Sequence, residues 1–120
     1  MSWDGIEKRK LLRVNFNCRI VIYGPEKDTI DTVANNISEG GIGFTLTRKL
    51  EISSIVGLEI YGVQEKPIVC KGIVRWVKSI ESSHWRGRFL FNTGIQFYQI
   101  KDKDLLTVKN LVESIAIEKE

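Results

Sequence analysis

Apolar and polar residues alternate with a period of two along most of this chain, and only the segment beyond Ile100 departs from that period. The clearest run extends from 14 to 22, where every second residue is apolar: Val14, Phe16, Cys18, Ile20 and Ile22. Successive side chains of a strand point to opposite faces, so the run predicts a strand with one buried and one solvated face. Comparable runs predict further strands at about 29–37, 42–46, 54–61, 67–79 and 87–98.

Beyond Ile100 the apolar spacing becomes helical. The predicted apolar stripe consists of Leu105, Leu106, Val108, Leu111, Val112 and Ile115. Asp102 is a suitable N-cap, and Asp104 suits the positive end of the helix dipole. Many antiparallel strands in a short chain favour a closed barrel, because closure removes exposed edges. We therefore predict an all-β fold, in which residues 14–117 form a six-stranded antiparallel barrel with a C-terminal α-helix, preceded by a flexible arm over 1–13.

The composition describes one soluble domain with a mild positive charge. The chain has 120 residues, of which 42% are hydrophobic, and 18 Lys and Arg stand against 15 Asp and Glu, a net charge of +3. So small an excess argues against binding of bulk nucleic acid but permits a small anionic ligand. No stretch is apolar enough to span a bilayer or to act as a secretory signal. Cys18 and Cys70 form no CxxC pair, which indicates free thiols and a reducing, cytoplasmic location.

Signatures of catalysis or of a metal site are scarce. His84 is the single histidine and lies beside Trp85 in a predicted loop, where a solvated side chain is the simpler interpretation. No Cys/His group has the spacing of zinc ligands, and no nucleophile-elbow, P-loop or dinucleotide-binding motif occurs. We therefore expect neither an enzyme nor a bound cofactor or metal.

The first candidate binding segment precedes the first strand. Lys8, Arg9, Lys10 and Arg13 place four cations within six residues. In an extended chain Arg9 and Arg13 lie on the same solvated face, roughly 13 Å apart. Two guanidinium groups there can grip phosphate or the O6/N7 edge of guanine. Taken alone, the cluster is more typical of a solvated, flexible terminal arm.

The second candidate segment, residues 36–41, ends the second predicted strand. Alternation places Asn36 and Ser38 outward together, while Ile37 points to the core. Gly40 and Gly41 would allow a turn through positive φ and a close approach of a ligand to exposed backbone N–H groups. An amide, a hydroxyl and backbone amides can read a base edge. By itself this segment also fits an ordinary polar turn.

The two segments together resemble the PilZ domain family, whose pattern is RxxxR followed by [D/N]xSxxG after a strand hairpin. This sequence has RKLLR at 9–13 and NISEGG at 36–41, and Gly72–Trp76 and Gly94–Phe97 also resemble family elements. The resemblance covers about residues 6–117. It implies a six-stranded barrel with a C-terminal helix and a receptor for cyclic di-GMP. The ligand-binding residues that it implies are Arg9, Arg13, Asn36, Ser38 and Gly41, with Lys8, Lys10 and Gly40 as further candidates.

The mechanism expected from this resemblance is a clamp: the ligand fixes the N-terminal arm against the barrel, and the new surface recruits or releases an effector protein in trans. A homodimer remains open. One alternative is a ligand-independent adaptor that uses the loop around His84–Arg86. Another is a single-strand nucleic-acid binder built on Trp76, Trp85, Phe89 and Phe91, although alternation predicts that most of these aromatic residues lie in the core.

Overall fold

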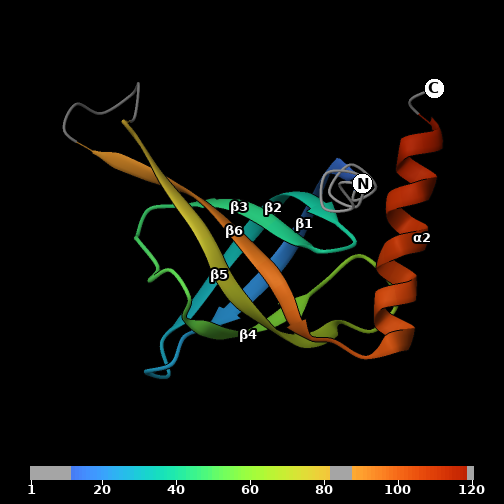
Figure 1. Ribbon diagram of the computed structural model, residues 1–120, viewed down its shortest axis with the longest axis horizontal. Helices are drawn as coiled ribbons and strands as arrows, with labels where there is room; N and C mark the ends of the chain where they lie inside the picture. The colour runs from blue at the N-terminus through green and yellow to red at the C-terminus, as the bar shows by residue number, and fades with distance from the viewer. Residues whose placement is uncertain (1–11, 82–87, 119–120) are drawn as a thin grey trace, which may run out of the picture.

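The computed structural model describes residues 12–81 and 88–118, which fold into a closed antiparallel barrel and one helix (Figure 1). The elements are β1 (Arg13–Tyr23), β2 (Thr29–Ser38), β3 (Gly41–Leu46), β4 (Ile55–Ile60), β5 (Ile68–Glu81), β6 (Phe89–Gln99) and α2 (Asp102–Glu118). The strand order around the barrel is β1-β2-β3-β6-β5-β4, and β4 pairs back with β1. The predicted fold class is thus confirmed.

The apolar side chains of the period-two pattern in β1 fill the barrel interior, as predicted. Val14, Cys18, Ile20 and Ile22 are buried, whereas Arg13 and the polar residues between them face solvent. The core also takes residues from every other strand, among them Phe44 of β3. Of the predicted arm over 1–13, only residues 12 and 13 belong to the described part, and Arg13 already begins β1.

A β-bulge in β5 changes which side chains face outward. Val74 lies opposite Ile95 and Trp76 lies opposite Gly94, so Arg75 is an extra residue without a partner on β6. The extra residue turns Trp76 away from the interior that Val74 occupies, and Trp76 is 44% exposed. Phe89 is 51% exposed as well. The prediction that most of these aromatic residues are core residues is therefore wrong for both.

Helix α2 packs against β1 and β2 through Val108 and Val112, which are buried (Figure 1). Leu106 is 57% exposed, so it does not belong to the packed stripe, contrary to the prediction. The helix also begins one residue earlier than predicted: the Lys101 carbonyl accepts the first helical hydrogen bond, which makes Asp102 the first helical residue rather than the N-cap. Within 12–81 and 88–118, no helix has the length and apolar character needed to traverse a bilayer.

Candidate functional site

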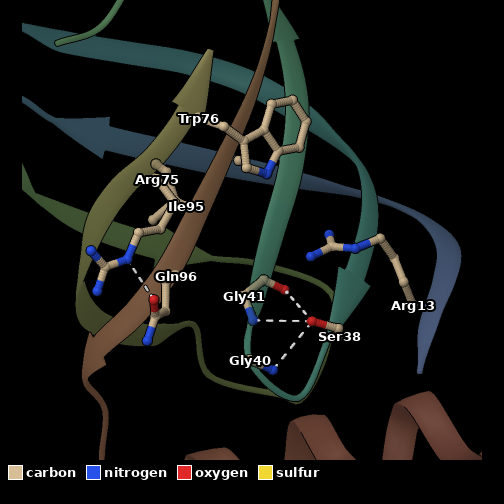
Figure 2. Close-up of a pocket in the computed structure, with 9 residues that line it drawn as sticks. Arg13, Ser38, Gly40, Gly41, Arg75, Trp76, Ile95 and Gln96 are labelled. Atoms are coloured by element: carbon tan, nitrogen blue, oxygen red, sulfur yellow. Dashed lines mark hydrogen bonds between the residues drawn. The ribbon is translucent and has the colours of Figure 1, made fainter. Parts of the chain in front are cut away.

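An open pocket of about 450 Å³ lies on the outer wall of the barrel, where the β2–β3 turn meets β5 and β6 (Figure 2). Its size is in the range of pockets that bind small molecules. The residues that line it are Arg13, Ser38, Gly40, Gly41, Arg75, Trp76, Gly94, Ile95 and Gln96. This lining contains two arginines and no carboxylate, so the pocket suits an anionic ligand.

The turn between β2 and β3 forms the floor of the pocket, and the Ser38 hydroxyl organises it. Ser38 Oγ accepts hydrogen bonds from the N–H groups of Gly40 (3.2 Å) and Gly41 (3.1 Å), and Ser38 is 3% exposed. Ser38 lies on the outer face with Asn36, as predicted, because it pairs with Arg13 of β1 and lines the pocket. Its hydroxyl, however, satisfies the turn amides that the prediction left open to a ligand. Ser38 shapes the site, and its Oγ is already engaged.

Gly41 is required by a close approach of strands rather than by an unusual backbone angle. Among the described residues the single glycine with positive φ is Gly62, so the predicted positive-φ turn at Gly40 and Gly41 is not found. Gly41 lies opposite Gln96, and a Cβ at Gly41 would lie 2.1 Å from the Ile95 carbonyl oxygen. Only glycine lets β3 and β6 approach this closely and close the barrel beneath the pocket.

Arg13 reaches the pocket from the first residue of β1, and Asn36 holds it there. Arg13 Nη1 donates a hydrogen bond to Asn36 Oδ1, and Figure 2 shows the guanidinium directed toward the Ser38–Gly41 turn. Asn36 in turn leans over Gly43, where a Cβ would lie 2.7 Å from Asn36 Oδ1. Asn36 therefore acts on the pocket through Arg13 and does not line it.

A second guanidinium and an indole complete the pocket on the opposite side (Figure 2). Arg75 Nε donates to Gln96 Oε1 at 2.5 Å, which holds the guanidinium at the bulge of β5. The indole of Trp76 lies over Gly94, because Gly94 has no side chain to keep it away. The exposed ring gives the pocket a planar apolar surface next to its cations, an arrangement suited to a nucleobase.

The structure thus brings together Arg13, Ser38, Gly40 and Gly41 of the predicted site residues, with Asn36 directly behind them. Arg9, Lys8 and Lys10 lie outside the described residues, as do His84 and Trp85.

The site prediction missed Arg75, Trp76 and Gln96. Their signal was present in the two family-like segments of β5 and β6, but strand alternation alone placed Trp76 inside the barrel. In the part of the chain that the structure describes, no three His, Cys, Asp or Glu side chains gather as metal ligands.

The structure is thus a six-stranded closed barrel that carries a cationic pocket on its outer wall. The family model "PilZ domain" matches residues 7–114. The chain therefore belongs to the PilZ domain family.

Solved structures share this fold at low sequence identity. The Bacillus subtilis inhibitor of motility MotI/DgrA superposes with a TM-score of 0.75 and 18% identity, over 93% of this chain and 53% of that one. MrkH of K. pneumonia gives 0.76 and 14%, over 92% and 49%. The PilZ domain of Escherichia coli YcgR, solved with c-di-GMP, gives 0.71 and 11%, over 93% and 94%. This chain spans about half the length of the MotI and MrkH chains. No curated protein matches the sequence.

Proposed function

We propose that this chain is a cyclic di-GMP receptor that binds the nucleotide in the pocket between Arg13 and Trp76. The observation that carries the proposal is the convergence of Arg13, the Ser38–Gly41 turn, Arg75 and Trp76 on one cationic pocket. The PilZ domain of YcgR and MrkH have both been solved with this nucleotide, which supports the same ligand class here.

The energetics require several of these groups to act together. A micromolar complex corresponds to about 8 kcal/mol. A bidentate arginine–guanine contact contributes about 1–3 kcal/mol, and stacking of one base on an aromatic ring contributes a similar amount. Arg13, Arg75 and Trp76 therefore supply most of the required free energy only in combination. Phosphate neutralisation by Arg9, with Lys8 and Lys10 nearby, would supply the remainder.

Isothermal titration calorimetry with cyclic di-GMP tests the proposal. Arg13→Ala should weaken binding by about 5- to 150-fold, the equivalent of a contact of about 1–3 kcal/mol. It should leave the thermal midpoint nearly unchanged, because an exposed side chain contributes little to stability. Arg48→Ala is the matched control, since Arg48 is also exposed but pairs with Asp28 rather than lining the pocket. Undiminished binding by Arg13→Ala would reject the assignment. The same titration gives the number of ligands per chain.

The proposed output is a clamp that signals to an effector protein in trans. Arg13 ends the RxxxR segment, so a ligand held by Arg9 and Arg13 would fix residues 5–13 against the barrel. Amide hydrogen exchange should then show new protection over 5–13 when the nucleotide binds, and unchanged exchange would exclude the clamp. Capture experiments with and without nucleotide would identify the effector, and sedimentation would detect a homodimer. We place this activity in the cytoplasm, where the free thiols of Cys18 and Cys70 stay reduced.

The exposure of Trp76 and Phe89 favours one second candidate, single-strand nucleic-acid binding, since both rings are available for stacking. Competition decides between the two. A receptor binds cyclic di-GMP in the presence of excess oligonucleotide, whereas a nucleic-acid binder prefers the oligonucleotide and loses it at higher salt. A chain that binds neither would be a ligand-independent adaptor.

A further inference from the structure

A second hollow, of about 640 Å³, lies on the outer wall of the barrel and shares no lining residue with the pocket described above. Its centre is a row of residues across four strands, formed by Tyr23 of β1, Gly57 of β4, Lys71 of β5 and Gln99 of β6. Lys71 precedes Arg75 by four residues on β5, so the two hollows lie about 13 Å apart along that strand. We name this second hollow the Gly57 groove.

One end of the Gly57 groove is flat and apolar. Gly57 has no side chain, and a Cβ there would lie 3.4 Å from Tyr23 Cβ, in ordinary contact with the tyrosine. The Tyr23 hydroxyl donates to Glu59 at 2.6 Å, and this hydrogen bond raises the pKa of Tyr23 and keeps the phenol neutral. Val69 is 60% exposed beside it. A planar ring can therefore lie on the Gly57 backbone between Tyr23 and Val69.

The other end of the groove is cationic. Lys71 and Lys101 line it, and within 12–81 and 88–118 neither has an ion-pair partner. The single carboxylate of the lining, Glu59, accepts hydrogen bonds from Tyr23 and, at 3.2 Å, from Tyr61. It is thus engaged with the tyrosines, while the lysines are left to attract a negative charge.

The groove is open to solvent along one side. Tyr23 is 42% exposed and Val69 is 60% exposed, so a bound group would keep one side in solvent. Small-molecule sites bury most of the ligand surface, whereas a protein partner covers the open side with its own surface. The two ends of the groove, an apolar floor beside Tyr23 and the cationic Lys71 and Lys101, complement an aromatic side chain next to carboxylates, a combination that a protein segment supplies.

We propose that the Gly57 groove docks a segment of a partner protein in which an aromatic side chain is followed by carboxylates. The aromatic ring lies on Gly57 against Tyr23, and the carboxylates pair with Lys71 and Lys101. This docking surface does not depend on the nucleotide pocket and is tested on the chain without nucleotide.

The test is a titration of the ¹⁵N-labelled chain with the blocked tripeptide N-acetyl-Trp-Asp-Glu-amide, followed by ¹H–¹⁵N chemical shifts. Saturable shifts should concentrate at Gly57, Lys71 and Gln99, with a dissociation constant on the order of 1 mM for so short a peptide. Peptides in which alanine replaces the ring, or lysines replace the carboxylates, should bind at least about tenfold more weakly. Equal binding of either control peptide, or no shift at about 5 mM, overturns the proposal.

Two variants keep the test specific to the groove. Gly57→Val fills the floor, and valine suits a strand. Its Cβ would make only ordinary contact with Tyr23, so the barrel should fold and the peptide should lose its shifts. Lys71→Glu should weaken binding by at least about tenfold, whereas Lys109→Glu, on the exposed face of α2, should not change it. Retained binding by Gly57→Val, with thermal unfolding confirming a folded barrel, overturns the proposal.

Discussion

The contact between Trp76 and Gly94 leads to a sharp prediction about Gly94→Ala. An alanine Cβ at position 94 would lie 2.2 Å from the indole Nε1, a distance that forces the ring to move. Trp76 is 44% exposed, so a little over half of its surface is covered in the fold. With roughly 200 Å² for a buried tryptophan, the covered part is about 110 Å². At about 25 cal/mol per Å² this corresponds to at most about 3 kcal/mol.

We expect Gly94→Ala to lower the free energy of unfolding by about 1–3 kcal/mol, because the displaced indole loses part of this contact. In a Trp76→Ala background the obstacle is gone. The same Gly94→Ala change should then raise stability by roughly 0.5 kcal/mol, since glycine inside a strand is less stable than alanine. The effect of one substitution thus reverses its sign with the residue on the neighbouring strand.

Urea unfolding of the four chains of this double-mutant cycle measures the coupling directly. Equal destabilisation by Gly94→Ala in both backgrounds would refute the reasoning, because the obstacle would then be backbone rather than indole. Calorimetry with cyclic di-GMP on the same four chains adds the functional readout. Gly94→Ala should weaken binding about as much as Trp76→Ala does, since both remove the indole from the pocket.

Three further predictions concern the core and the barrel closure. Gly41→Ala should cost about 3 kcal/mol in urea unfolding, because its Cβ meets a backbone oxygen of β6 that cannot swing aside; a loss below about 1 kcal/mol would contradict this. Val108→Ala should cost about 2 kcal/mol by thermal unfolding, whereas the exposed Leu106→Ala should change stability by less than about 0.5 kcal/mol. Burial raises the pKa of Cys18 to about 11 and of Cys70, with a smaller effect of a nearby carboxylate, to about 12. Above pH 9 the unfolded chain releases thiol protons that the folded chain keeps. The free energy of unfolding should therefore be constant below pH 9 and fall between pH 9 and 12. The fall should be less steep in variants in which alanine replaces either cysteine.

The fold could be predicted because the apolar pattern that defines each strand or helix lies within a short stretch of the sequence. In β1 each apolar residue at an even position from Val14 to Ile22 faces the interior, at least in part, and the sequence alternation states this directly. The change to helical spacing beyond Ile100 likewise marks α2. Leu106 was wrongly assigned to the buried face, because the sequence alone does not show which side of the helix packs against the barrel.

The details of the site could be predicted only in part, because they depend on contacts between distant segments. Alternation along β5 cannot reveal the extra residue at Arg75, so it places Trp76 on the wrong face. The predicted turn residues line the pocket, but the role of Ser38 depends on which donors its hydroxyl meets. The need for glycine at position 41 comes from the carbonyl of Ile95, which lies more than fifty residues away in the sequence.

The pairing of β3 with β6 affects both the stability of the barrel and the shape of the proposed binding pocket. Gly41 opposite Gln96 closes the barrel and also joins the two halves of the pocket, the β2–β3 turn on one side and the bulged β5 with β6 on the other. Residues that permit this pairing, such as Gly41, cannot be changed without a loss of stability. Arg13 lies at the rim and contributes charge without supporting the barrel. Loss of binding at constant stability therefore separates the groups that contact the ligand from those that shape its pocket, and Arg13 should fall in the first class and Gly41 in the second.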